Sequence, residues 1–399
     1  MSLSGTLKLL NFSVFLRSHL FLLPVLFLFY QQYGITVGDF FLLQGLSALL
    51  CLLLDVPCGY LADIYSKKKV LIFSGTLLFL RFALLYFFPS YWIIFLGEAL
   101  YAVVISTFVG TADSYIYELL KMNGKTVKML KRYGRLYFYV SLGTSVSSLA
   151  GAYLFDLYGA DTVILITMIY VALSTMLLFL LPELPKTKRQ IRTLPQRCHD
   201  LADIIRKSFK QRPIKNLMIF SGFLTAAYQI FMWSMQPLMK LALVPVFLFG
   251  VVFFINHLAR ALGSFFAHKL TRALKLKKLG YLSYGGFIVS FIAAIALTHT
   301  TNVYVSIPLL VFICLMIGFQ VAFLISAISH IHEKSSSSER ATFASINSMW
   351  GRLLSAICLI LSKFILDQNS LQTNMIIFMI LFSFAFVPLK NFVSDIKNK

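Results

Sequence analysis

The chain has 399 residues, of which 59% are hydrophobic and only 13% are charged, and its formal net charge is +21. Soluble globular domains contain about 25% charged residues, so this composition excludes an ordinary soluble protein and indicates a membrane protein. In a soluble chain the positive charge would suggest nucleic-acid binding. Here the basic residues fall in loops between long apolar segments, so we expect no nucleic-acid partner.

Six apolar segments in the first half are long enough to cross a membrane, which takes about 20 residues as a helix. They cover residues 9–33, 38–62, 69–88, 91–119, 135–156 and 162–181. Six more follow at residues 214–240, 244–267, 279–298, 303–330, 341–365 and 373–390. The sequence therefore predicts an all-α protein with twelve transmembrane helices.

Between the two sets lies a polar stretch, residues 183–213, which is rich in lysine and arginine. Within it, Leu201, Ile204, Ile205 and Phe209 recur at helical spacing, which is typical of an amphipathic helix on an anionic membrane surface. We interpret residues 183–213 as a cytoplasmic linker, with residues 1–182 and 214–399 as the N-terminal and C-terminal six-helix bundles.

The loops differ in charge on the two sides of the membrane. Lysines and arginines gather between helices 2 and 3, 4 and 5, and 8 and 9, whereas QQYGITVGD, FPSY, DLYGAD and HTTN contain none. Only Lys240 and Lys363 break this pattern. Because basic loops stay in the cytoplasm, we expect both termini there, in a multi-pass protein of the cell inner membrane.

The segment GYLADIYSKK follows the second apolar segment. It resembles the loop G-x-L-A-D-R-x-G-R-K between helices 2 and 3 of the major facilitator superfamily, although Ile64 replaces the family's arginine and Ser66 its glycine. The resemblance implies two pseudo-symmetric bundles that open alternately to each side. It also implies a gate at the cytoplasmic face, formed by Gly59, Asp63, Lys67 and Lys68.

Two further segments resemble one bacterial branch of that family, whose members are drug and solute exporters. DVP at residues 55–57 is similar to the E-x-P of that branch, and ERATFASINSMWGRLLSAICLILSKFILD is similar to its helix 11. In GTSVSSLAGAY, Gly143, Gly151 and Ala152 match in size the small residues of the helix 5 antiporter motif, but Ser147 and Ser148 replace its glycine and proline. Small residues at this spacing let helices approach closely.

Ionisable residues occur inside the apolar segments, where an isolated charge is costly and is expected to pair or to line a wet cavity. Glu98 stands where many members of the family have an arginine linked to proton handling. We consider two roles for it, a proton carrier or a structural partner of Arg17 or Arg81. The bacterial branch has an acidic residue in helix 4, and Asp113 lies one residue after the corresponding position when Tyr117 and Glu118 are aligned with that branch. The candidates for proton coupling or cavity charge are Glu98, Asp55, Asp113, Arg17, Arg81 and Arg352.

Polar and aromatic residues in the second half suit a substrate cavity for an amphipathic organic solute with few charges. Aromatic residues at helical spacing also serve plain helix packing, and the sequence leaves both roles open. The candidates are Gln229, Trp233, Asn347 and Trp350.

These patterns predict a secondary active transporter of a small organic solute, with proton-coupled export by antiport as the first hypothesis. Proton-coupled uptake of a nutrient or siderophore is the second, and a membrane sensor or scaffold without transport is an alternative of another class. We expect protons, the solute and membrane lipids as its partners, and we expect the protein to be a monomer. No Walker loop, HExxH or Cys/His spacing occurs, so we expect no enzyme, no metal site and no cofactor.

Overall fold

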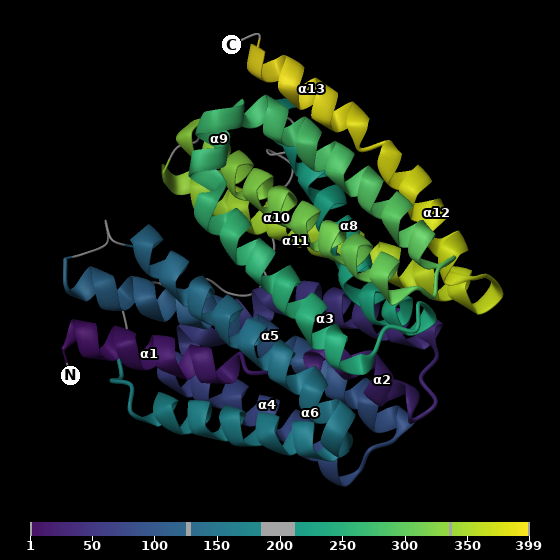
Figure 1. The fold of residues 1–399 in the computed structure, drawn as a ribbon. Helices are drawn as coiled ribbons and strands as arrows, with labels where there is room; N and C mark the ends of the chain where they lie inside the picture. The colour runs from purple at the N-terminus through teal and green to yellow at the C-terminus, as the bar shows by residue number, and fades with distance from the viewer. Residues whose placement is uncertain (1, 125–128, 185–211, 335–336, 398–399) are drawn as a thin grey trace. The chain divides into compact units, whose positions relative to one another are not determined.

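The computed structural model describes residues 2–124, 129–184, 212–334 and 337–397. Within these ranges the chain is helical with short connections and contains no strand, as predicted (Figure 1). The predicted amphipathic helix of the linker lies in residues 185–211, outside the described part of the chain.

The first predicted span, residues 9–33, is interrupted. Helix α1 covers Leu3–Arg17, a turn follows, and the chain resumes as the short 3-10 helix η1, Leu23–Val25, and helix α2, Leu26–Gln31. Pro24 lies in the first turn of η1 and is buried. Proline has no amide hydrogen and its ring collides with the carbonyl four residues earlier, which disfavours a continuous helix through Leu20–Pro24.

The next three helices are close to their predicted positions: α3 covers Val37–Ile64, α4 covers Lys67–Phe87 and α5 covers Tyr91–Met122. Helices α1, α4, α5 and α6 pack together. Their contacts enclose an apolar core that includes Leu10, Val14, Leu71, Tyr115 and Leu178. Ser13 of α1 and Ser174 of α6 exchange hydrogen bonds across this core, which satisfies two hydroxyl groups away from water.

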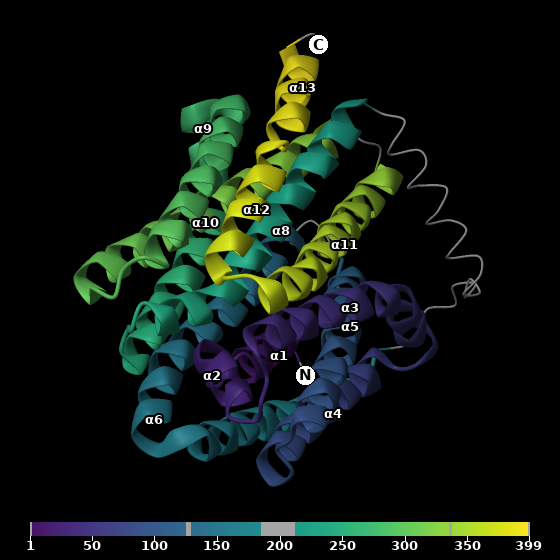
Figure 2. The same cartoon turned by 90° about the vertical axis from the view of Figure 1, so that its right-hand side faces the viewer.

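Two long helices each contain two predicted spans. Helix α6, Met129–Phe179, turns back at Gly159, whose φ of 79° suits a residue without Cβ (Figure 2). Helix α9, Val246–Leu297, bends at Lys275, which has a φ of 60°. The described residues contain nine helices that are long and apolar enough to cross a membrane. With α6 and α9 each divided at the bend, and with the interrupted first span, they are consistent with the predicted twelve.

The remaining helices of the second half are α8, α10 and α11, which cover Arg212–Leu241, Val303–Lys334 and Ser337–Gln368. The last predicted span, residues 373–390, is divided into α12, Leu371–Ser383, and α13, Phe386–Lys397, which follow one another (Figure 1). Helix α8 packs against α11 and α13.

The chain forms two compact units. The first contains residues Met1–Ile35, Leu50–Cys198 and Val246–Phe254, and the second contains Thr36–Leu49, His199–Pro245 and Ile255–Lys399. The first unit thus includes the beginning of α9, and the second includes the first thirteen residues of α3, Val37–Leu49. Helices α3 and α9 therefore each contribute to both units.

Candidate functional site

The first unit contains a buried ion pair between α4 and α5. Arg81 Nη2 lies 2.8 Å from Glu98 Oε1, and the two side chains are only 4% and 3% exposed. The hydroxyl of Tyr30 donates a hydrogen bond to Glu98 and accepts one of 3.1 Å from Arg81. Arg81 Nε also donates to the carbonyl of Gly97 at 3.1 Å, and its guanidinium lies over the ring of Tyr101. The charges are therefore paired, and three further groups surround them.

This geometry matches one of the two roles considered for Glu98, a pair with Arg81 rather than with Arg17. Removing one member of a buried pair leaves an uncompensated charge, which is far more costly than the pair itself. The sequence did not indicate Tyr30 or Tyr101 as participants. Tyr30 belongs to α2, beyond the break at Pro24, and no spacing pattern relates it to Arg81.

Arg17 at the end of α1 occupies a different place in the same unit. Its guanidinium donates a 3.0 Å hydrogen bond to Ser74 Oγ and lies 4.0 Å from the ring centroid of Phe108. Ser74 in turn donates to the carbonyl of Val104, and Arg17 is 8% exposed. Arg17 thus joins α1 to α4 and α5 through a hydroxyl and an aromatic face.

The predicted cytoplasmic gate residues lie at the end of α3 and the start of α4. Lys67 forms an ion pair of 2.7 Å with Glu118 of α5, and both side chains are partly exposed, at 11% and 19%. Lys68 is half-buried, and a Cβ on Gly59 would meet no atom within 4 Å. The side chain of Asp63 is outside the described part of the structure. The other charged candidates, Asp55 on α3, Asp113 on α5 and Arg352 on α11, are all half-buried.

The predicted cavity residues of the second unit separate into two kinds. Asn347 accepts a 2.5 Å hydrogen bond from Ser221, and a Cβ on Gly222 would lie 2.6 Å from Trp350 Cδ1. Asn347 and Trp350 therefore pack α11 closely against α8. Gln229 and Trp233 of α8 are half-buried like the other two, but Trp233 contacts α3.

Trp233 contacts a residue that the sequence did not indicate. Its ring meets that of Phe40 on α3 edge to face, with 5.7 Å between centroids. Gln44 lies one turn further along α3 and is 5% exposed. Within the described residues, Trp233 Nε1 and Gln44 Nε2 are buried donors without an acceptor. Two unused donors near an aromatic ring can bind a polar solute that brings its own acceptors.

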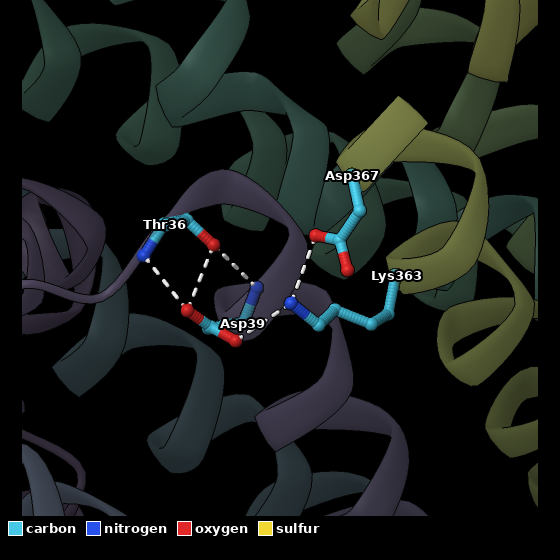
Figure 3. A network of polar contacts seen from close by, with 4 residues as sticks. All are labelled: Thr36, Asp39, Lys363 and Asp367. Carbon is cyan, nitrogen blue, oxygen red and sulfur yellow. Dashed lines mark hydrogen bonds and ion pairs between the residues drawn. The ribbon is translucent and has the colours of Figure 1, made fainter. Parts of the chain in front are cut away.

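The second unit also contains a network of four polar residues at the start of α3 and the end of α11 (Figure 3). Lys363 Nζ lies 2.9 Å from Asp39 Oδ1 and 2.8 Å from Asp367 Oδ1. The other carboxylate oxygen of Asp39 accepts hydrogen bonds from the backbone and hydroxyl of Thr36, whose hydroxyl accepts one from the Asp39 amide. This reciprocal arrangement begins α3 as a capping box does.

Close packing of α3 and α11 supports this network. A Cβ on Gly38 would lie 2.5 Å from Asp367 Oδ1, and a Cβ on Gly45 would lie 2.8 Å from Ile360 Cγ1. These glycines are seven residues apart and share one face of α3. Lys363, which breaks the charge pattern of the loops, is thus compensated by two acids.

We expect Asp39→Asn to lower the free energy of unfolding by about 1 kcal/mol, because a partly exposed ion network contributes at the upper end of surface pairs. Asp367→Asn should cost less, since Asp367 is 42% exposed and Asp39 only 12%. Chemical denaturation of the purified variants measures both. In about 1 M salt the Debye length is near 3 Å, so the difference between them should shrink. Equal, salt-independent losses would contradict an electrostatic contribution from Asp39.

The comparisons with known proteins agree with this architecture. The sequence model of the Major Facilitator Superfamily matches residues 7–359. The nucleoside transporter NupG is similar over 100% of both chains, with a TM-score of 0.74 at 18% identity. A bacterial homologue of the human lysosomal transporter Spinster, in an inward-facing and occupied conformation, is similar over 98% of both chains, with a TM-score of 0.74 at 14% identity. An auto-inhibited peptide transporter of the POT family is similar over 99% of this chain and 97% of its own, with a TM-score of 0.74 at 13% identity. No curated protein sequence matches the chain.

The apolar helices of the described residues, with charges paired inside them, indicate a multi-pass membrane protein. The family match shows that it is a transporter and not an enzyme. Because the family model covers most of its length, this chain belongs to the major facilitator superfamily. The predicted family and fold class are thereby confirmed. The likeness to solved structures, at 18% identity or below, supports the fold alone.

Proposed function

We propose that the protein is a secondary active transporter that moves a small organic solute across the cell inner membrane by alternating access. The family match over residues 7–359 carries this proposal. The similar structures have names that refer to a nucleoside transporter, a lysosomal transporter homologue and a peptide transporter. They therefore support a small solute without selecting one.

The proposed coupling ion is the proton, and the proposed direction is export. Glu98 is almost fully enclosed and paired with Arg81, so a proton from water has little access to it in this state. Asp55 and Asp113 are half-buried on α3 and α5, which makes them the better candidates for a carboxylate that gains and loses a proton. The export direction rests on the resemblance to the bacterial exporter branch and on the partial helix 5 motif.

The proposed gate is the segment between α3 and α4 that resembles the family's loop motif. A carboxylate at Asp63 can accept hydrogen bonds from free N–H groups at a helix N-terminus and interact with its dipole. The ion pair between Lys67 and Glu118 anchors the start of α4 to α5 beside it. Together with Gly59 and Lys68, these residues would close the cytoplasmic end in the outward-open state.

The proposed solute has an apolar part and several hydrogen-bonding groups. Trp233 and Phe40 offer aromatic surface, while Gln44 and the Trp233 indole offer donors without acceptors in the described structure. Gln229 lies one turn before Trp233 on α8, on the same helix face. An uncharged hydrocarbon would leave these donors unsatisfied, which disfavours it as the solute.

Everted membrane vesicles test transport, coupling and direction together. We expect vesicles containing the protein to accumulate at least one member of a panel of radiolabelled solutes, and an uncoupler to abolish the accumulation. Accumulation only in right-side-out vesicles would instead support the uptake symporter. If neither preparation transports any solute while the protein is abundant and folded, the sensor or scaffold alternative gains support.

The proposed orientation, with both termini in the cytoplasm, has its own test. Four cysteines are buried, so Cys198→Ser leaves a background of low reactivity. In that background we expect Tyr158→Cys to react with an impermeant thiol reagent on intact cells, because Tyr158 is 65% exposed in the turn within α6. Lys269→Cys, near the bend of α9, should react only after the membrane is permeabilised. The opposite pattern would reverse the orientation.

A further inference from the structure

The charges inside the membrane spans are not all compensated. Arg81 is paired with Glu98, Lys67 with Glu118, and Lys363 with two aspartates. Among the described residues, Arg17 and Arg260 have no carboxylate within ion-pair distance. Arg17 is enclosed by Ser74 and Phe108, whereas Arg260 is half-buried and remains accessible. A cation at this depth is costly, so an uncompensated and accessible one suggests a ligand.

Arg260 is held in place by one residue of the neighbouring helix. Its Nη1 donates a 2.7 Å hydrogen bond to the hydroxyl of Tyr228 on α8, and its guanidinium carbon lies 4.5 Å from the centroid of that ring. Both interactions use the same aromatic side chain and leave the other N–H groups without an acceptor in the described structure. A guanidinium has five such donors in a planar fork, which matches a carboxylate or phosphate group.

The orientation of α9 shows that Arg260 does not face the lipid side. Leu258, Leu262 and Phe265 form an exposed apolar stripe on this helix, with exposures of 40%, 47% and 76%. At about 100° per residue, Arg260 lies roughly 140–160° around the helix from all three. Its accessible surface is therefore on the opposite side from the stripe that suits lipid tails.

The neighbouring residues on α9 agree with an inward-facing polar surface. Gly263 is in close backbone contact with Gly318, which holds α9 firmly against α10. Asn256 lies one turn before Arg260 and is fully buried, and its side-chain oxygen has no donor among the described residues. The face of α9 that carries Arg260 thus includes a second polar residue and packs against α10.

We propose that Arg260, oriented by Tyr228, binds an oxyanion group of the transported solute, a carboxylate or a phosphate. The solute is then an organic anion with polar and apolar parts. This inference rests on the proposed transport function, but the binding of an anion can be measured without transport. The cost of keeping an arginine inside the second unit is offset when the anion binds, because the two charges then compensate each other.

The test is thermal unfolding of the purified full-length protein in nanodiscs with matched pairs of ligands. The pairs are benzoate and benzamide, succinate and succinamide, and glucose 6-phosphate and glucose, with inorganic phosphate and chloride tested alone. We expect at least one carboxylate or phosphate compound to raise the unfolding temperature saturably, while its neutral counterpart has no effect. The carboxylate and phosphate pairs distinguish the two oxyanions.

Three variants assign the effect to Arg260. Arg260→Gln should weaken binding of the stabilising anion roughly 10–100-fold, since charged hydrogen bonds are lost. Arg272→Gln, an exposed arginine of the same helix, should leave it unchanged. Arg260→Lys keeps the positive charge but lacks the planar array of N–H donors, so it should retain part of the affinity and the preference for the anion over its neutral counterpart. This variant tests the proposal even if Arg260→Gln folds poorly.

The proposal is overturned if neutral counterparts stabilise as well as the acids, if Arg260→Gln binds the anion like the wild type, or if no oxyanion in the panel binds. Vesicle transport of a neutral solute by both the wild type and Arg260→Gln would also overturn it, while the proposed transport function would stand. If no solute is transported but Arg260 still binds the anion, the proposed transport function is wrong and the anion site stands.

Discussion

Glu98→Gln is expected to lower the free energy of unfolding by about 3–5 kcal/mol, the loss found when one partner of a buried ion pair is removed. Glutamine keeps the size of the side chain but removes its negative charge. Arg81 is then a buried cation whose acceptors, the glutamine amide oxygen, the Tyr30 hydroxyl and the Gly97 carbonyl, are all neutral. Denaturant unfolding in detergent, followed by tryptophan fluorescence, measures the effect. Substrate exchange and gradient-driven transport should then fall together.

The control is Glu118→Gln on the same helix. Glu118 is also paired with a base, Lys67, but it lies near the end of the span with a side chain 19% exposed, so its loss should cost about 1 kcal/mol or less. A second control replaces both members of the buried pair with Arg81→Met and Glu98→Leu, which should recover much of the stability. If Glu98→Gln is as stable as the wild type and loses only transport driven by a pH gradient, Glu98 is the proton carrier after all.

Gly151→Ala is expected to prevent close packing of α6 and to cost about 3 kcal/mol or more, because an added Cβ would overlap the backbone carbonyl of Phe21. The carbonyl belongs to the turn between α1 and η1 and cannot rotate away as a flexible side chain would. Gly143 makes a similar approach eight residues earlier, where a Cβ would lie 2.6 Å from the carbonyl of Phe15. The yield of monodisperse protein and its unfolding temperature measure the effect.

Gly110→Ala provides the matched comparison within the same unit. Gly110 lies in the interior of α5, and a Cβ there would meet no atom within 4 Å. Alanine is a better helix former than glycine by about 1 kcal/mol, so Gly110→Ala should keep or slightly raise the stability. Equal losses for both substitutions would mean that backbone flexibility, not close contact with Phe21, accounts for the glycine at 151.

Much of the fold could be predicted from local properties of the sequence. A membrane span needs only a sufficient run of apolar residues, so the spans could be located without knowing their neighbours. Gly143 and Gly151 predicted close helix contacts because a residue without a side chain permits them. Pro24 lacks an amide hydrogen and so favours the break in the first span, but hydropathy does not register this. Pro57, Pro237 and Pro308 lie inside continuous helices, so the proline alone did not decide where a helix breaks.

The partners of the charged residues depended on tertiary structure. The sequence left Arg17 and Arg81 open as partners of Glu98, because rotation and register of the helices decide which cation faces it. Only the structure brought Tyr30 to that pair and placed Lys363 between Asp39 and Asp367. It likewise showed Asn347 and Trp350 packed on α8. Composition and apolar runs therefore determined the class of protein and its spans. Contacts between distant residues could be identified only in the folded structure, because a shift of one residue along a helix turns a side chain by about 100°.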